Sequence, residues 1–380
     1  MAKKMLEVDR TRRLKSVQRL VVKVGTRVLT SEKNLLDVGW IEVLAGQIAK
    51  LRCRGVDIAI VSSGAVGAGM GQLSMKRRPR SIPQLQAAAA VGQNQLMHSY
   101  QVAFGGYNLT IAQILLTADD LKNRQRYLNV RNTLLTLWDY GVIPILNEND
   151  SVAIDEIRLG DNDNLSAQVA NLIDADLLII LSDTDGFFSA DPRKDPQAHL
   201  ISTITEISPE LEELAGEAGS EVATGGMRTK LEAAKILIAS GQMMLIANGR
   251  KHSLVDILDG REVGTLFLPQ ADRMASRKRW IAFSHSPNGV LVVDDGAVQA
   301  IVERGKSLLP SGVVNLQGNF ENGDVVSILN LKGREIARGL VNYCDKELQK
   351  ILGKRSSEIE KILGYCYYEE VVHRDNLVIL

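Results

Sequence analysis

The chain has too few cysteines for a fold that depends on disulfide bonds. It has three cysteines, an odd number, and they are scattered through 380 positions (Cys53, Cys344 and Cys366). Small secreted proteins support a limited core with paired cysteines, whereas cytosolic proteins keep their thiols reduced. The five histidines also show no spacing typical of metal ligands. We therefore expect a cytoplasmic protein without a disulfide framework.

The chain has no excess of charge of either sign. It contains 45 Lys+Arg and 45 Asp+Glu, which argues against a general nucleic-acid or membrane-surface binder. No apolar run approaches the length of a membrane-spanning helix. Residues 1–19 are basic but contain Glu7 and Asp9 and no apolar stretch, so they do not resemble a secretion signal. We predict that they form a flexible N-terminal tail.

The sequence lacks the motifs of several common enzyme classes. It has no G-x-x-x-x-G-K-[ST] phosphate loop and no protein-kinase catalytic set. It has no Ser-Gly elbow and no convincing Cys/His arrangement for nucleophilic catalysis. What remains is a pair of separated lysines, several Gly-rich loops and a loop rich in Asp and Asn. This combination suits phosphoryl transfer by positioning and charge neutralisation rather than by covalent catalysis.

The most polar stretch is Gly160-Asp161-Asn162-Asp163-Asn164-Leu165-Ser166-Ala167. Two carboxylates and two carboxamides occupy four consecutive positions, and an apolar helical run follows them. This places the cluster at a helix N-terminus, where unpaired backbone N–H groups point outward. Helix capping is the alternative interpretation, but a cap needs only one such side chain or two. The cluster therefore predicts a functional site.

The order of apolar runs predicts an α/β fold. Strand-like and helical runs alternate to about residue 270, which is typical of an open, mostly parallel sheet flanked by helices. The expected strands are Leu20–Val24, Asp57–Val61, Thr110–Leu116, Val142–Leu146, Asp176–Leu181, Met243–Ala247 and a final edge strand at Gly264–Leu268. Because ligands of such sheets bind at the carboxyl ends of the strands, the polar clusters found there predict an active site along one edge.

Three of these clusters suit the binding of a charged small molecule. Lys23 ends the first strand, where an anionic ligand would offset the cost of burying an ammonium, unless the side chain reaches the surface. Ser62-Ser63-Gly64 follows the second strand. Small residues there allow a ligand to approach backbone N–H groups, although a tight turn would use the same residues. Asn147-Glu148-Asn149-Asp150 follows the strand at 142–146 and is a second acidic loop.

A phosphate site is predicted at Thr224-Gly225-Gly226-Met227-Arg228-Thr229-Lys230, which opens a helix. Free amides, the helix dipole and a cation all favour an anion at such a position. The alternative is a flexible glycine loop that merely precedes a helix. Ser182-Asp183 ends the strand at 176–181 at the same predicted edge.

Composition changes near residues 275–288, and beyond them short strands are separated by turn signals. The expected strands are Val290–Val293, Val313–Leu316, Val325–Leu329, Ile336–Val341 and Val371–His373. We predict a small β-barrel domain at 288–366, with 367–380 as its C-terminal extension, after an α/β domain at 20–272. Residues 276–380 contain 14 Lys+Arg and 13 Asp+Glu, an excess of only one basic residue.

Taken together and in order, these motifs resemble those of the glutamate 5-kinase family, which has the amino-acid-kinase fold. The resemblance rests on Val22-Lys23-Val24-Gly25-Thr26, Val61-Ser62-Ser63-Gly64-Ala65, Asn147-Glu148-Asn149-Asp150, Gly160–Ala167 and Thr224–Lys230. It covers the chain from about Leu20 onward, and the C-terminal part resembles a PUA domain through Leu308-Leu309-Pro310-Ser311-Gly312, Gly318-Asn319-Phe320 and Gly333–Ala337. Ser182 stands where some members have Thr, which keeps the hydroxyl.

The resemblance implies that ATP and L-glutamate give ADP and L-glutamyl 5-phosphate, the first step of proline biosynthesis. By the same resemblance, Lys23 and Lys230 neutralise the transferring phosphoryl group and Asp163 orients them. The acceptor is a side-chain carboxylate with an unperturbed pKa of about 4.3, so it is ionised at neutral pH and direct in-line transfer needs no general base.

Ligand contacts also follow from the resemblance. Ser63, Asp150 and Asn162 are expected to bind glutamate, with Asp150 better suited to its ammonium than to its carboxylates. The expected ATP-binding residues are Lys23, Ser182, Asp183, Thr224, Gly225, Gly226, Met227, Arg228, Thr229 and Lys230. Mg²⁺ is expected to be held mainly by ATP, without a direct protein ligand.

Other interpretations stay open. One is a kinase of the same fold that acts on a different acidic small molecule. A second is an RNA-associated protein, since PUA-like barrels occur in RNA-modifying proteins, but the balanced charge of residues 276–380 argues against RNA. A third is an amino-acid sensor with an inactive kinase domain, against which the presence of Lys23, Asp163 and Lys230 speaks. The resemblance further implies proline as feedback inhibitor, a homo-oligomer (dimer or tetramer), and glutamyl phosphate reductase as a partner; no membrane association is expected.

Overall fold

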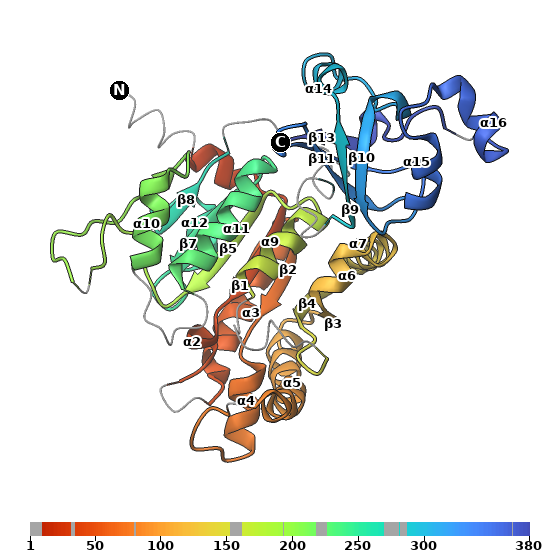
Figure 1. Ribbon diagram of the computed structural model, residues 1–380. Coiled ribbons are helices and arrows are strands. Elements are labelled where there is room, and N and C mark those ends of the chain that lie inside the picture. The colour runs from red at the N-terminus through yellow and green to blue at the C-terminus, as the bar shows by residue number, and fades with distance from the viewer. Residues whose placement is uncertain are drawn as a thin grey trace. The chain divides into compact units, whose positions relative to one another are not determined.

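The computed structural model describes residues 10–31, 35–79, 81–152, 162–192, 194–217, 226–269, 281, 287–366 and 368–380. The chain divides into two compact units (Figure 1). The first comprises residues 1–121 and 127–273, and the second comprises residues 122–126 and 274–380. Each unit has its own sheet and its own hydrophobic core, so each is described by itself.

The first unit is built on an eight-stranded sheet in the order β3-β4-β2-β1-β5-β7-β8-β6. The strands are β1 (Arg19–Val24), β2 (Asp57–Ser62), β3 (Ile111–Leu116), β4 (Ile143–Glu148), β5 (Leu177–Ser182), β6 (Thr203–Ile204), β7 (Met243–Asn248) and β8 (Thr265–Phe267). Neighbouring strands are parallel except β7 and β8, which are antiparallel. The mostly parallel α/β architecture expected from the alternating pattern is confirmed.

Helices connect these strands and cover the sheet (Figure 1). They are α2 (Thr26–Leu29), α3 (Val38–Arg52), α4 (Ala65–Gln72), α5 (Ile82–Gly105), α6 (Ala118–Lys122), α7 (Arg124–Asp139), α9 (Asp163–Leu172), α10 (Pro209–Glu217), α11 (Met227–Ala239) and α12 (Leu254–Leu258). The principal core joins α3, α5 and α12 to one face of the sheet. Helices α9 and α11 contact each other and strands β1, β5 and β7.

The alternation of side chains along β1 explains the position of Lys23. Val22 and Val24 belong to the core cluster with α3, so Lys23 lies on the opposite face of the strand. That face carries α9, which contacts β1, and α11, which contacts α9. Lys23 therefore points toward the two helices whose first turns hold the polar motifs predicted from the sequence.

Two expectations about the edges of the fold are wrong. The described part of the N-terminal segment is not a flexible tail. Residues 10–15 are helical, and Leu14 is fully buried in the core. The guanidinium of Arg10 donates to the carbonyl oxygens of Ser202 and Val263. The strand at 265–267 is also not an edge strand, because β6, which was not predicted, pairs with its far side.

The second unit contains a five-stranded sheet in the order β10-β9-β11-β12-β13. Its strands are β9 (Gly289–Val293), β10 (Val313–Gly318), β11 (Val325–Leu329), β12 (Glu335–Leu340) and β13 (Leu377–Ile379). Its helices are α14 (Asp295–Val302), α15 (Asp345–Ile351) and α16 (Ile359–Leu363), with short 3₁₀ turns at Pro310–Gly312, Ser356–Glu358 and Arg374–Asn376. The strand expected at 371–373 is only an isolated bridge between Leu308 and Val372, and the last strand lies further along the chain. In the part of the chain that is described, no helix is long and apolar enough to cross a membrane.

Candidate active site

The predicted polar clusters meet at the carboxyl edge of the eight-stranded sheet. Strand β1 lies between β2 and β5, and the register pairs Val24 with Ser62 on one side and with Leu181 on the other. After β1 the chain continues to β2 on one side of it, and it later returns to β5 on the other side. Such a topological switch point is where open α/β sheets bind their ligands.

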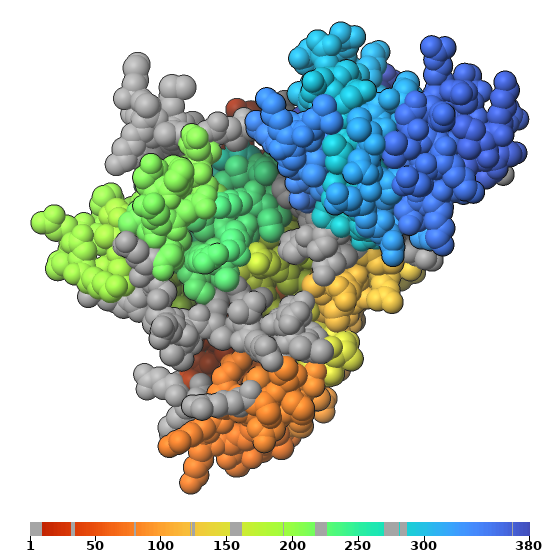
Figure 2. Space-filling model, in the orientation of Figure 1, coloured from red at the N-terminus to blue at the C-terminus, as the bar shows by residue number. Residues whose placement is uncertain are grey.

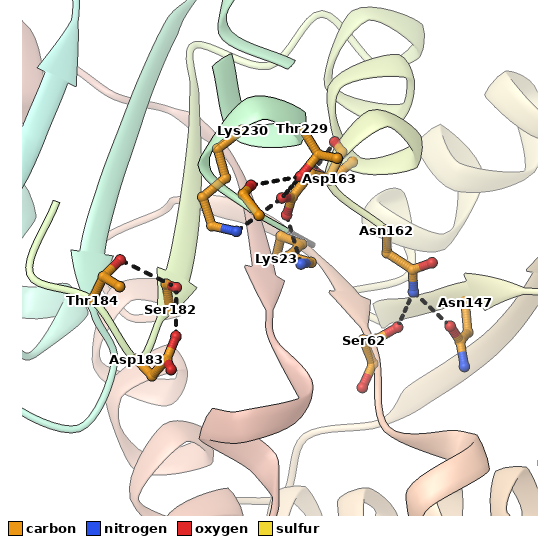
Figure 3. A network of polar contacts seen from close by, with 12 residues as sticks. Lys23, Ser62, Asn147, Asn162, Asp163, Ser182, Asp183, Thr184, Thr229 and Lys230 are labelled. Atoms are coloured by element: carbon orange, nitrogen blue, oxygen red, sulfur yellow. Dashed lines mark hydrogen bonds and ion pairs between the residues drawn. The ribbon is translucent and has the colours of Figure 1, made fainter. Parts of the chain in front are cut away.

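At this edge, one carboxylate bridges two lysines (Figure 3). Oδ1 of Asp163 lies 2.6 Å from Nζ of Lys23, and Oδ2 lies 3.1 Å from Nζ of Lys230. Asp163 is fully buried, and the two lysine side chains are only 6% and 7% exposed. Lys23 comes from β1, Asp163 opens α9, and Lys230 lies in the first turn of α11. The structure therefore brings together three residues from distant parts of the sequence.

The charge of Asp163 is held by its partners. Burial alone would raise the pKa of its carboxyl group, but the ion pairs with Lys23 and Lys230 outweigh this and hold the pKa well below its usual range. The hydroxyl of Thr229 adds a hydrogen bond to Oδ2 at 3.0 Å. Two cations and one carboxylate leave this cluster with an excess of one positive charge, which suits an anionic ligand.

Asn162, the residue before Asp163, is fixed to the ends of two neighbouring strands. Its Nδ2 donates to the carbonyl oxygen of Ser62 at 2.6 Å and to Oδ1 of Asn147 at 2.8 Å (Figure 3). Ser62 ends β2, and Asn147 is the penultimate residue of β4. The N-terminus of α9 is therefore held by the lysine pair on one side and by these strand ends on the other.

The other two predicted glutamate-binding residues lie on the same edge. Ser63 follows β2 and is buried, and Gly64 next to it has φ +93°, a left-handed conformation that favours glycine. Asp150 lies in the turn after β4 and is partly exposed.

The predicted nucleotide-binding residues lie on the β5 side. Ser182 is buried at the end of β5, and its hydroxyl donates to Asp183 Oδ1 at 3.2 Å (Figure 3). Asp183 also pairs with Arg27 at 2.8 Å, and its carbonyl oxygen accepts from Asn248 Nδ2 at 3.0 Å. Burial opposes ionisation of Asp183, but its bond to Arg27 leads the effects that lower the pKa.

Only part of the predicted phosphate loop can be described. Thr224 and Gly225 lie outside the described residues. Gly226 precedes α11, and the hydroxyl of Thr229 lies 2.8 Å from its carbonyl oxygen. Arg228 is largely exposed and pairs with Glu232 one turn later at 3.3 Å. Met227 is partly exposed.

The described side chains do not form a dedicated metal cage. Among them, no group of three or more His, Cys, Asp or Glu is placed to hold a metal ion. The buried Asp163 carboxylate is engaged by two ammonium groups. Mg²⁺ prefers oxygen ligands and usually keeps several waters while bridging substrate phosphates.

Several polar residues of this edge were not singled out from the sequence. Asn147 belongs to a recognised motif, but only Asp150 was chosen from it. Nothing in the sequence marks Gln93, because a Gln on a helix is usually solvated. Its Oε1 nevertheless accepts a hydrogen bond from Asn147 Nδ2 at 2.7 Å. Arg27 and Asn248 follow predicted strands, which was the available signal for both.

Comparison with known proteins agrees with this geometry. Residues 18–248 match the amino acid kinase family, and residues 289–363 match the PUA domain. The glutamate 5-kinase of Geobacter sulfurreducens is 53% identical over 368 residues, covering 97% of this chain and 99% of that protein. That of Geobacter metallireducens is 53% identical and covers 98% and 100%. That of Caldanaerobacter subterraneus subsp. tengcongensis is 51% identical and covers 95% and 98%. The chain therefore belongs to the amino acid kinase family, among its glutamate 5-kinases.

Proposed function

We propose that this protein transfers the γ-phosphoryl group of ATP to the side-chain carboxylate of L-glutamate, giving L-glutamyl 5-phosphate, the first step of proline biosynthesis. The observation that carries the proposal is the buried bridge of Asp163 between Lys23 and Lys230 at the switch point of the sheet. Similarity to glutamate 5-kinases over nearly the whole chain supports the choice of substrate.

The reaction joins two anions, so charge neutralisation is its main requirement. The glutamate side chain, with an ordinary pKa of about 4.3, is already an ionised nucleophile at pH 7. Lys23 and Lys230 stand ready to neutralise the oxygens of the transferring group, and Asp163 holds both ammonium groups in place before substrate arrives. Direct in-line transfer follows, since no side chain of the cluster needs to form a covalent intermediate.

The two substrates bind on opposite sides of β1 at the carboxyl edge of the sheet. Ser63, Asp150 and Asn162 bind glutamate, where the Asp150 carboxylate suits the α-ammonium group. Lys23, Ser182, Asp183 and the residues Thr224, Gly225, Gly226, Met227, Arg228, Thr229 and Lys230 bind ATP. Mg²⁺, held by the ATP phosphates, would supply further neutralisation of the developing charge.

The proposed assignment of the rest of the chain follows the family. Residues 20–272 form the kinase domain, and 288–366 with the extension 367–380 form the PUA-like domain. Proline acts as feedback inhibitor at the glutamate side, the enzyme works as a homo-oligomer in the cytoplasm, and glutamyl phosphate reductase takes up the labile acyl phosphate. These points rest on similarity to the glutamate 5-kinases.

Trapping the acyl phosphate with hydroxylamine tests the proposal. Purified protein is given Mg-ATP and one acceptor at a time, and ADP and hydroxamate are both measured. We expect hydroxamate with L-glutamate and none with N-acetylglutamate or aspartate. Hydroxamate with a different acidic acceptor would show a related kinase, and ATP binding without turnover on any acceptor would favour a sensor.

A further inference from the structure

Three amide side chains from separate elements form a hydrogen-bonded chain beside the lysine pair. They are Gln93 of α5, Asn147 of β4 and Asn162 before α9. Nδ2 of Asn162 lies 2.8 Å from Oδ1 of Asn147, and Nδ2 of Asn147 lies 2.7 Å from Oε1 of Gln93. Among the described residues no hydrogen bond joins Gln93 to either lysine, and it is not among the residues expected to bind glutamate or ATP.

Two backbone groups show which way these amides point. The carbonyl oxygen of Ser62 can only accept, and it receives a hydrogen bond from Nδ2 of Asn162 at 2.6 Å. The N–H of Glu148 can only donate, and it gives a hydrogen bond to Oδ1 of Asn147 at 2.9 Å. The oxygen and nitrogen of an amide are hard to distinguish by shape, but these fixed groups determine their assignment here.

These hydrogen bonds leave the side chain of Asn162 with only an acceptor to offer a ligand. Both hydrogens of its Nδ2 are used, one on Ser62 and one on Asn147 (Figure 3). Its Oδ1 has no hydrogen-bond partner among the described residues. The side chain of Asn162 can therefore accept a hydrogen bond from a ligand but has none to give. An amino-acid substrate has one strong donor, its α-ammonium group, whereas its carboxylates only accept.

We propose that Gln93 is a positioning residue that, through Asn147, keeps the carbonyl oxygen of Asn162 available to the α-ammonium group of the substrate amino acid. The inference rests on the proposed function. Because Oε1 of Gln93 accepts from Nδ2 of Asn147, the Asn147 amide is kept from rotating by half a turn. Such a rotation would place its nitrogen against two other donors, the N–H of Glu148 and Nδ2 of Asn162. Gln93 thus contributes to the recognition of a free amino group without touching substrate.

The test compares one substitution that removes the acceptor with one that keeps it. Gln93→Met keeps the length and loses the acceptor, whereas Gln93→Glu keeps carboxylate oxygens that accept from Asn147. Gln95→Met, on the exposed side of the same helix, is the matched control. Each variant is assayed with L-glutamate and with glutarate, which lacks the ammonium group, at saturating Mg-ATP. Thermal unfolding of each variant is measured in parallel.

We expect Gln93→Met to raise the glutamate KM on the order of tenfold, as for one misplaced hydrogen bond to a charged group. The preference for glutamate over glutarate, measured as a ratio of kcat/KM, should fall by the same factor, while the KM for ATP stays unchanged. Gln93→Glu and Gln95→Met should both keep the wild-type ratio.

An unchanged ratio in Gln93→Met would overturn the inference, and so would an equal loss in Gln93→Glu. Should Gln93→Met not fold, Gln93→Glu remains decisive, because an acceptor role requires it to keep the ratio. Wild-type protein that forms no hydroxamate with L-glutamate would overturn the proposed function and this inference together. An active wild type with an unaffected Gln93→Met would overturn the inference alone.

Discussion

The carboxylate of Asp163 lies 2.6 Å from the ammonium group of Lys23, at a position without solvent exposure. A second ammonium group, of Lys230, lies 3.1 Å from its other oxygen. Two cations in one buried place would repel each other strongly, and the carboxylate between them offsets this repulsion. The cluster is thus formed before any ligand arrives, and such preorganisation is the feature that electrostatic catalysis requires.

Asp163→Asn should impair both activity and folding. An amide keeps the shape but leaves two buried cations without their counter-ion, which costs about 3–5 kcal/mol when one partner of a buried pair is lost. We expect kcat to fall on the order of a hundredfold or more. Denaturant unfolding and the hydroxamate assay measure the two effects. Asp259→Asn, which breaks the exposed pair with Arg54, is the control and should change stability by less than about 1 kcal/mol. Equal effects of both substitutions would contradict the assignment.

Asp163 should also contribute to acid sensitivity. Its pKa is depressed in the folded protein, whereas an unfolded Asp has a pKa of about 3.9. Its stabilising contribution is therefore fully present above that unfolded value and is lost as the pH falls toward the folded value. The free energy of unfolding of the wild type, followed from pH 7 to below about 4, should decline more steeply than that of Asp163→Asn. Parallel curves would mean that other carboxylates account for the acid dependence.

Lys230→Ala should lower kcat far more than it raises the glutamate KM. The ammonium group of Lys230 is paired with Asp163, and in the proposed reaction it neutralises charge that develops in the transition state. We expect a loss of kcat of about two orders of magnitude or more. Lys235→Ala, on the same helix in an exposed pair with Glu212, should leave both constants unchanged. A loss confined to the glutamate KM would count against this role.

Gly92→Ala should destabilise the packing of α4 against α5. A Cβ at Gly92 would lie 1.9 Å from the carbonyl oxygen of Ala65, the first residue of α4. Figure 2 shows the atoms of these two helices, coloured orange, packed in one block. The clash should cost about 1–3 kcal/mol and move the turn at Ser63, so the glutamate KM should rise with it. Gly105→Ala is the control on the same helix, since nothing lies within 4 Å of its Cβ. Wild-type stability in Gly92→Ala would show that α4 shifts without cost.

Leu14→Ala tests whether the N-terminal segment belongs to the fold. Leu14 is fully buried in the principal core, so truncation should cost about 2–5 kcal/mol. Leu35→Ala, at a side chain that is 51% exposed, should have little effect. Denaturant midpoints of the two variants give the comparison. A midpoint for Leu14→Ala equal to that of the wild type would restore the interpretation of a loose tail.

Much of the site could be predicted from the sequence because its motifs are local. A buried strand that ends in Lys23 indicated a charged partner, and four polar residues before an apolar helix indicated more than a cap. The partner proved to include the chain's own Asp163, a pairing that spacing along the chain cannot show. The hydrogen bond between Gln93 and Asn147 was beyond prediction, because a single Gln on an amphipathic helix carries no pattern.

The sequence by itself determined most of the strands and helices and the residue types at the strand ends, because side-chain periodicity and turn chemistry act over a few residues. Only the tertiary structure decided which of these ends meet. The parallel register sets Lys23 beside Val61 and Ile180, and the packing of α9 and α11 brings Asp163 and Lys230 to it. It also decided that Leu14 enters the core, since burial depends on the neighbours that a segment finds in space.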